Sequence, residues 1–491
     1  MELHALATDT TLTLWWEQPE QSPANAEYTV LLDGRAVCQV RRTHCTLDVL
    51  QPDTAYRAQV LTGGEELGSA TVRTLSAPAR RLDVTAFGAV GDGATLNTKA
   101  LQAAIDACGK DEEVCIPRGA FLTGGLRLHS DMRLYLAEGA VLQGTDNPED
   151  YLPKIPSRFE GTEMMCYQSL LNLGERDHQA GPNCRNVLIH GQGVISGGGQ
   201  SLAMRVIETE RERLKDYIAS LGDKVKECEN DNTIPGRARG RLINLSNCEH
   251  IRITGLTLLN GASWNVHMLY ARDIVTDHCV FRSEEVWNGD GWDPDSSEDC
   301  MLFACTFHTG DDSVAIKSGK NPEGNRINRP TRHIRIFDCD VRYGLGISIG
   351  SEISGGVEDV RIWDCDLEHS LYGVQIKGTK KRGGYVREIS VRDCVLPRFV
   401  CCAVLYNDDG IGWHTPPKFS GLRCERVHLT GWARNYWEKE LHAMPCIDLC
   451  GFDVPGYEVS DVAFTACTAA GEATIALNRC SDISLGITKV E

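Results

Sequence analysis

Three aspartates form the densest cluster of reactive side chains in this chain. Asp290 lies in the segment EEVWNGDGWDPDSSEDC, and the pair Asp311–Asp312 lies in FHTGDDSVAIKSGK, where Asp311 follows Asp290 by 21 residues. Carboxyl groups that crowd one surface repel each other, which raises at least one pKa, so that one group keeps its proton while another stays ionised. This division suits general acid–base chemistry, such as the hydrolysis of a glycosidic bond.

The strand pattern around these aspartates decides whether they can meet. From residue 82 onward, alternating apolar strands followed by Asp/Asn-Cys and a second apolar pair recur about every 20 to 30 residues, as in HIRITGLTLLN, DCMLFACTF and DVRIWDCDL. Because no helices of crossover length separate them, the pattern predicts an all-β parallel β-helix over residues 82–491. A spacing of 21 residues is about one coil, so Asp290 is expected beside Asp311 and Asp312, at a coil spacing of about 4.8 Å.

A different strand texture precedes this repeat. Residues 1–77 contain short alternating strands with turn signals, including TLTLWWEQP, AEYTVLLDGRAV and CTLDVLQPDTAYRAQVL, which predict a small antiparallel β-sandwich. The run from Leu50 to Tyr56, with a tryptophan upstream, resembles a fibronectin type III domain, in which Tyr56 would form the tyrosine corner. The segment SAPAR at residues 76–80 is the expected linker.

Charge and hydropathy limit the partners. The chain carries 68 Asp+Glu against 50 Lys+Arg, a formal net charge of -18, which argues against nucleic acid or an anionic membrane as the main partner. A local basic cleft can still bind an acidic sugar polymer, because salt screens distant charges. The first 20 residues show neither a basic region nor an unbroken apolar run, so no signal peptide is expected. Nor is any stretch long and apolar enough to cross a membrane.

The 21 cysteines are spread singly through apolar strands, where cysteine behaves as a small hydrophobic residue. We expect an interior ladder made of Cys279, Cys300, Cys305, Cys339, Cys365 and Cys394. Since no CxxC pair or Cys/His cluster has metal-ligand spacing, neither a metal nor a cofactor is expected. The odd number and the single placement predict a reduced, cytoplasmic protein.

One segment interrupts the β pattern. Residues 203–231, AMRVIETERERLKDYIASLGDKVKECEND, are charged and carry a partial apolar stripe, which predicts a helical insertion. The insertion could wall one end of the site, or it could form a subunit contact and make the protein a homo-oligomer.

The aspartate segments resemble a known signature. Asn288-Gly289-Asp290-Gly291-Trp292-Asp293 is similar to the Asn-Thr-Asp-Gly-aromatic-Asp motif of glycoside hydrolase family 28, the polygalacturonases, and the segment from Gly310 to Gly319 is similar to its paired-aspartate motif. The resemblance covers about residues 83–485, and with a fibronectin-like domain in front the layout looks most similar to exo-acting bacterial members.

This resemblance implies a right-handed β-helix and a division of roles. Asp311 would be the general acid that protonates the leaving oxygen, while Asp290 and Asp312 would hold and activate water, giving inversion at the anomeric carbon. The other polar and aromatic members of the two motifs are expected to contact the substrate: Asn288, Trp292, Asp293 and Lys317.

Two departures from the family pattern affect the substrate. Leu345 stands where the family usually has the histidine that supports the acid, and Gln375 stands where it has an arginine that helps to hold a galacturonate carboxylate. A neutral amide is a poor substitute for a charged bidentate fork. Lys377 remains, and Arg382 follows it in the basic segment KGTKKRGGYVR, so both are expected to bind a uronate or a chain end.

The favoured function is therefore exo-acting, inverting hydrolysis of oligosaccharides derived from pectin, with terminal galacturonate ranked first. Within this class, because of Leu345 and Gln375, rhamnogalacturonan-type and other glycosides remain alternative substrates. Two other classes remain: a pectate-lyase-like β-helix that eliminates with Ca²⁺ held on clustered carboxylates, and a non-catalytic carbohydrate-binding solenoid.

Hydrolysis and elimination give different products. We expect cleavage of pectic oligosaccharides to yield saturated products at a rate that a chelator does not change, because the predicted machinery consists of carboxyl groups alone. Ultraviolet absorbance during digestion, with and without chelator, checks this. An absorbing unsaturated product that disappears with chelator would instead identify a lyase.

Overall fold

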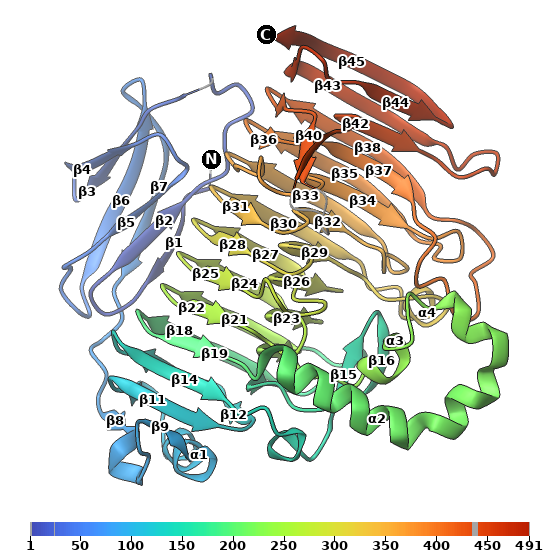
Figure 1. Ribbon diagram of the computed structural model, residues 1–491. Helices are drawn as coiled ribbons and strands as arrows, with labels where there is room; N and C mark the ends of the chain where they lie inside the picture. The colour runs from blue at the N-terminus through green and yellow to red at the C-terminus, as the bar shows by residue number, and fades with distance from the viewer. Residues whose placement is uncertain (1, 24, 435–439, 491) are drawn as a thin grey trace. The chain divides into compact units, whose positions relative to one another are not determined.

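The computed structural model describes residues 2–23, 25–434 and 440–490. Its chain divides into two compact units, residues 1–81 with 109–113, and residues 82–108 with 114–491 (Figure 1). In the described part of the chain, no helix is both long and apolar enough to cross a membrane.

The first unit is built from two antiparallel sheets. One sheet contains β1 (His4–Ala7), β2 (Leu12–Trp15) and β5 (His44–Leu47). The other, in the order β4-β3-β6-β7, contains β3 (Tyr28–Leu32), β4 (Arg35–Val40), β6 (Ala55–Thr62) and β7 (Glu65–Arg73). Leu14, Trp16, Tyr28 and Val60 pack into one buried cluster, so the alternation seen in the sequence produces a small sandwich core.

The second unit is a right-handed parallel β-helix whose coils stack in sequence order, from cyan to red in Figure 1. A coil is typified by β24 (Arg272–Asp277), β25 (Val280–Arg282) and β26 (Trp292–Asp295). Each of these strands pairs in parallel with its counterpart in the next coil, β27 (Glu298–Phe303), β28 (Thr306–His308) and β29 (Val314–Ile316). The predicted β-helix is thus confirmed.

The described residues of this unit form three long sheets. The largest, of 15 strands, contains β24 and β27 together with β8 (Arg81–Asp83), β10 (Glu113–Ile116), β13 (Met132–Leu136), β18 (Cys184–Gly191), β21 (Cys248–Thr254), β30 (Thr331–Phe337), β33 (Val357–Trp363), β35 (Tyr385–Arg392), β36 (Val395–Leu396), β38 (Lys418–Glu425), β39 (His428–Leu429), β43 (Val459–Ala470) and β45 (Cys480–Val490). The sheet of eight contains β25 and β28 with β9 (Asp92–Leu96), β11 (Gly119–Thr123), β14 (Ala140–Gly144), β19 (Val194–Ser196), β22 (Thr257–Leu259) and β31 (Asp340–Tyr343).

The third sheet, of 11 strands, carries the aspartate segments. It contains β26 and β29 with β12 (Leu126–Leu128), β17 (Leu171–Leu173), β20 (Ile243–Ser246), β23 (Val266–Leu269), β32 (Ile347–Ile349), β34 (Val374–Gly378), β37 (Phe399–Ala403), β42 (Ile447–Cys450) and β44 (Ile475–Asn478). Side chains alternate along each strand, so Trp292 and Val314 join the interior core while Asp293 and Lys317 point to the outer face.

The cysteine ladder explains how the coils turn. Cys279, Cys300, Cys305, Cys339, Cys365 and Cys394 are all buried in the interior core, as predicted. At all six of these positions the preceding residue has a left-handed backbone, with φ between 48° and 55° in His278, Asp299, Ala304, Asp338, Asp364 and Asp393. Asp tolerates this conformation better than most residues. The repeated Asp-Cys dipeptide therefore marks a corner followed by an inward-pointing thiol.

Segments outside the coils add a hairpin and several helices. The antiparallel hairpin β15 (Ile155–Phe159) and β16 (Thr162–Cys166) precedes the long helix α2 (Gly199–Leu221), drawn in green in Figure 1. The predicted helical segment therefore begins four residues earlier than residue 203. The remaining elements are η1 (Val84–Phe87), α1 (Thr98–Asp106), η2 (Pro148–Tyr151), η3 (Gly222–Glu227), α3 (Thr233–Gly236), α4 (Glu323–Ile327), β40 (Trp432–Arg434) and β41 (Leu441–Ala443).

The interior stack should control stability. Phe307 is 1% exposed and its ring stacks on Phe281 of the previous coil, with centroids 4.6 Å apart. Phe307→Ala removes this contact and leaves a cavity, so we expect a loss of about 3–5 kcal/mol of unfolding free energy, measurable by denaturant titration. Phe307→Leu should lose clearly less. Equal stability of the alanine variant and the original protein would contradict this packing.

Candidate active site

The three aspartates lie in the turns that lead into β26 and β29. The N–H of Gly291 donates to the carbonyl oxygen of Asp312 at 3.0 Å, which ties the turn of one coil to the turn of the next. Asp290 and Asp312 are each 3% exposed, whereas Asp311 is only partly buried. The predicted meeting of the three carboxyl groups on adjacent coils is therefore confirmed, and Asp311 is the most accessible of them.

This close approach requires a glycine between Asp290 and Trp292. A Cβ atom at Gly291 would lie 2.4 Å from the carbonyl oxygen of Ser313 and 2.8 Å from the Phe307 ring. Both neighbours are held in the coils, so any side chain at this position would push the two aspartate turns apart.

Asp312 is held by two partners from the following coils. The hydroxyl of Ser348, on β32, donates to its Oδ1 at 2.5 Å, and the ammonium of Lys377, on β34, donates to its Oδ2 at 2.9 Å. Burial alone would lower the pKa of Lys377, but the Asp312 charge raises it well above the ordinary value. Both side-chain oxygens of Asp312 are thus engaged by donors from the following coils.

Asp290 and Asp293 share a second lysine. Lys317 Nζ lies 3.4 Å from Asp290 Oδ2 and 3.7 Å from Asp293 Oδ2. Burial, followed by the charge of Asp293, raises the pKa of Asp290 well above its usual range, and burial raises the pKa of Asp293 to about 7. Oδ1 of Asp290 is buried and has no hydrogen-bond partner among the described residues, so its capacity to accept a hydrogen bond is unused.

Asp311 has the environment of a general acid. Burial and the charge of Asp312 raise its pKa to about 6. Its Oδ1 accepts the backbone N–H of Asp312 at 3.0 Å, and its Oδ2 accepts a side-chain N–H of Asn288 at 3.3 Å. A carboxyl group with a pKa near 6 is still largely protonated in mildly acidic solution and can donate its proton to a leaving group.

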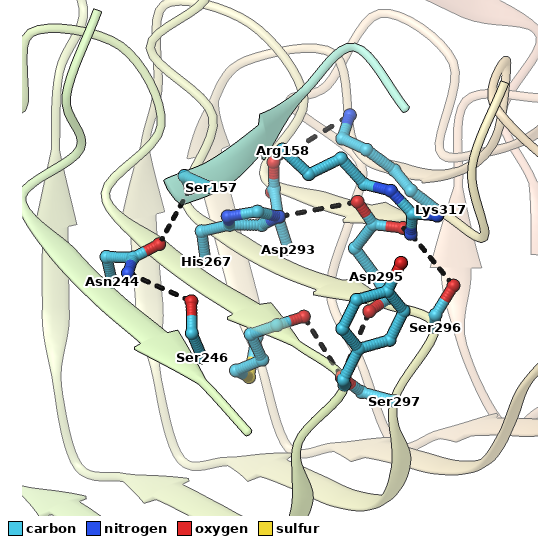
Figure 2. Close-up of polar contacts among 12 residues, drawn as sticks. Ser157, Arg158, Asn244, Ser246, His267, Asp293, Asp295, Ser296, Ser297 and Lys317 are labelled. Atoms are coloured by element: carbon cyan, nitrogen blue, oxygen red, sulfur yellow. Dashed lines mark hydrogen bonds and ion pairs between the residues drawn. The ribbon is translucent and has the colours of Figure 1, made fainter. Parts of the chain in front are cut away.

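Beneath Lys317 lies a buried charge network that no sequence motif indicated (Figure 2). Arg158, from the hairpin strand β15, donates to Asp295 Oδ1 at 2.9 Å, and His267 Nε2 lies 3.4 Å from Asp295 Oδ2. Burial lowers the pKa of His267 to about 4, whereas the pKa of Asp295 is lowered despite its burial by Arg158 and His267. Arg158 precedes Asp295 by 137 residues, so only tertiary structure brings them together.

The two departures from the family pattern lie at this site. The N–H of Leu345 donates to the carbonyl oxygen of Asp311 at 3.0 Å, and the Leu345 side chain is partly buried. Gln375 pairs with Ser348 in the β32–β34 register, and its Oε1 lies 3.5 Å from the Ser348 hydroxyl. An apolar and a neutral side chain thus occupy positions beside Asp311 and Asp312.

Two predicted substrate contacts are wrong. Trp292 is fully buried in the interior of the β-helix, where its indole N–H donates to Thr276, because it alternates with the outward Asp293. Arg382 is also fully buried, and its guanidinium donates to Asn321 Oδ1 at 2.7 Å and to the Asn407 carbonyl at 2.7 Å. Neither side chain can contact a sugar without unpacking. The structure does bring Asn288, Asp293, Lys317, Leu345, Gln375 and Lys377 to the aspartates.

The sequence is similar to that of known carbohydrate-active enzymes. The chain is 29% identical over 398 residues to an exo-poly-alpha-D-galacturonosidase of Dickeya chrysanthemi, covering 76% of this chain and 66% of the relative. It is 34% identical over 345 residues to a probable polygalacturonase of Vitis vinifera, covering 67% and 63%. The chain thus spans about two thirds of the length of these two curated relatives.

The fold agrees with solved structures. A family 28 exopolygalacturonase from Yersinia enterocolitica matches with a TM-score of 0.84 at 22% identity, over 99% of this chain and 95% of that one. A hyperthermoactive exopolygalacturonase from Thermotoga maritima matches with a TM-score of 0.68 at 23% identity, over 84% and 92%. The model of the family described as Glycosyl hydrolases family 28 matches residues 155–408, more than half of the chain and including all three aspartates. This protein therefore belongs to family 28 of the glycosyl hydrolases.

Proposed function

We propose that the protein is an inverting, exo-acting hydrolase that releases terminal galacturonate from pectin-derived oligosaccharides. The observation that carries the proposal is the contrast between neighbouring carboxyl groups: Asp311 is partly exposed with a pKa near 6, while Asp312 is buried against Lys377. The names of the Dickeya and Yersinia relatives support exo action on galacturonan.

In the proposed reaction, Asp311 gives its proton to the glycosidic oxygen as the bond from this oxygen to the anomeric carbon breaks. A water molecule held by Asp290 and Asp312 attacks the opposite face of that carbon and loses a proton to Asp312, whose charge Lys377 and Ser348 balance. The new hydroxyl is inverted relative to the original bond. Proton transfer through solvent then restores Asp311 and Asp312.

Exo action is supported by contacts among three segments: the β15–β16 hairpin, the helical insertion with the residues that follow it, and the segment that contains Asn407 and Asp409. Arg237, which follows the helical insertion, forms ion pairs with Glu160 at the hairpin turn, at 2.8 Å, and with Asp409, at 3.0 Å. The N–H of Glu229, at the end of the insertion, donates to Asn407 Oδ1 at 3.1 Å. Burial, followed by the charge of Asp311, raises the pKa of Glu229, so the joined segments come close to the acid. A barrier at this point would favour substrates that present a chain end.

The structure limits the identity of the sugar next to the cleaved glycosidic bond less than it limits the type of reaction. Lys377 and Lys317 are both engaged with aspartates, and Gln375 and Leu345 add no charge. These observations favour, as a second candidate, a rhamnogalacturonan-type or other glycoside whose sugar in that position is neutral.

The first unit is proposed to be a fibronectin type III-like domain. Its sheets β1-β2-β5 and β4-β3-β6-β7 have the strand order expected for that domain, and the hydroxyl of Tyr56, at the start of β6, accepts the backbone N–H of Gln51 at 3.0 Å. All 21 cysteines lie in the described part of the chain and none is in a disulfide, which supports the proposal of a reducing, cytoplasmic environment.

The role of Asp311 can be tested by substitution and pH. Asp311→Asn should lower kcat/KM by about 10²- to 10⁴-fold, because an amide cannot donate the catalytic proton. In the original protein, kcat/KM should fall as pH rises through about 6, where Asp311 loses its proton. Rates measured from pH 4 to 8 check both. Asp223→Asn, on a side chain that is 91% exposed in the insertion, is the matched control. An Asp311→Asn variant with the original rate would refute this assignment.

Product analysis tests exo action and the sugar together. Oligogalacturonides labelled at the reducing end should lose monomers stepwise from the other end, and the first product seen by nuclear magnetic resonance should have the inverted anomeric configuration. Rhamnogalacturonan oligomers form the second arm. Internal cuts at early times would contradict exo action, and turnover of only the second substrate would move the assignment to the alternative.

A further inference from the structure

Arg239 is a buried arginine that lies next to the acid site without touching an aspartate. It is fully buried, and follows α3 at the end of the helical insertion. Its Nε donates to the Gly236 carbonyl at 2.8 Å, and one terminal nitrogen donates to the carbonyl oxygens of Trp287 at 2.9 Å and Ala262 at 3.3 Å. The other terminal nitrogen donates to Asn288 Oδ1 at 2.6 Å. The guanidinium therefore links three segments of the chain.

Aromatic rings hold this guanidinium in place. It lies over the Trp287 ring at 4.3 Å and over the Phe159 ring at 5.3 Å, and Gln200 at the start of α2 accepts the backbone N–H of Trp287. Burial lowers the pKa of Arg239 to about 10, so the group stays charged at any pH at which the enzyme would act. The donor that faces Asn288 is thus rigid and permanent.

The Asn288 amide can be oriented in only one way by these neighbours. A guanidinium has donors and no acceptor, so the Asn288 atom that faces Arg239 must be the carbonyl oxygen. The NH2 group then points to the other side, where it donates to Asp311 Oδ2 at 3.3 Å. If the amide turned over, its NH2 would face the guanidinium and its oxygen would face the carboxyl group of Asp311.

We propose that Arg239 is a positioning residue which locks the Asn288 amide with its NH2 group toward Asp311, and so sets the proton affinity of the general acid. The inference rests on the proposed function, because it assigns Asp311 as the acid. Arg239 would act on Asp311 through the side chain of Asn288, and the segment that follows the helical insertion places it at the site.

The direction of the effect follows from the hydrogen bonds. An N–H donated to Asp311 stabilises its carboxylate and lowers its pKa, opposing burial and the Asp312 charge. An amide oxygen in the same place would accept a hydrogen bond from the protonated form and raise the pKa. The other charged or titratable groups that act on Asp311 are Asp290, Asp293, Lys317, Lys377, Glu229 and Tyr406.

The test is the alkaline limb of the kcat/KM profile. Asn288→Ala removes the donor, and Arg239→Met releases the amide, so each should move this limb to higher pH by about half a unit to one unit. Arg239 also carries a charge, whose loss alone would raise the pKa of Asp311. The double variant separates the two causes: if Arg239 acts through Asn288, adding Arg239→Met to Asn288→Ala should move the limb clearly less than Arg239→Met moves it in the original protein.

Two further variants complete the comparison. Arg241→Met removes a second buried arginine, which stacks on the same Phe159 ring at 4.7 Å and whose hydrogen bonds within the described residues go to the backbone carbonyls of Arg239 and Arg158. It should therefore leave the limb in place whatever it does to the rate. Arg239→Lys keeps a charge and a donor, and should return the limb toward the original position. Circular dichroism and thermal midpoints identify variants that fail to fold.

Several results would overturn the proposal. An unchanged limb in Asn288→Ala does so even if Arg239→Met cannot be purified. If adding Arg239→Met to Asn288→Ala moves the limb as far as Arg239→Met moves it alone, the effect belongs to charge and not to Asn288. An equal shift in Arg241→Met would assign it to general loss of packing. Failure of the original protein to cleave oligogalacturonides would refute the proposed substrate instead, and the same comparison would then be made on whichever glycoside it does cleave.

Discussion

The parallel stacking of one coil on the next, in fixed register, is the constraint on which the active site depends. Trp292 pairs with Val314, and Val314 with Ile347, so the turns ahead of β26, β29 and β32 lie directly above one another. A slip of one residue would exchange the inner and outer faces and remove the carboxyl groups from the site. The interior side chains that resist such a slip, including the Phe281–Phe307 stack, therefore hold the arrangement of the aspartates as well as the core.

The register of the coils brings several carboxyl groups together where they are poorly solvated and repel each other. Positively charged lysines from the following coils offset this cost. Lys317 forms ion pairs with Asp290 and Asp293, and Lys377 forms one with Asp312. Among the described residues Asp311 has no ion pair with a lysine, and burial and the charge of Asp312 raise its pKa to about 6. One outer face of this sheet thus holds Asp311, whose pKa is raised, beside Asp312, which forms an ion pair with Lys377.

Segments inserted between coils complete the site from outside the repeat. The hairpin β15–β16 brings Arg158 to Asp295, and the return from the helical insertion brings Arg237 and Arg239 to the hairpin turn and to Asn288. Arg158 and Arg239 are fully buried and Arg237 is partly buried, and each donates to more than one acceptor, so together they tie the insertions to the coils. Differences in chain-end access within one β-helix fold can then arise from the insertions, without change to the aspartates.

The sequence by itself determined the repeat, the coil length and the reactive aspartates, because these depend on local periodicity: a spacing of 21 residues is enough to predict that Asp290 meets Asp311 and Asp312. Trp292 and Asp293 are neighbours on one strand, so the same alternation predicts that they point to opposite faces. The expectation for Trp292 was wrong because it placed every residue of the motif in contact with the substrate, whereas Trp292 is buried. Arg158, Arg239 and the burial of Arg382 were decided only by tertiary structure. Their partners lie tens of residues or more away, and an isolated arginine in a sequence carries no sign of whether it will meet solvent, a carboxylate or an amide side chain.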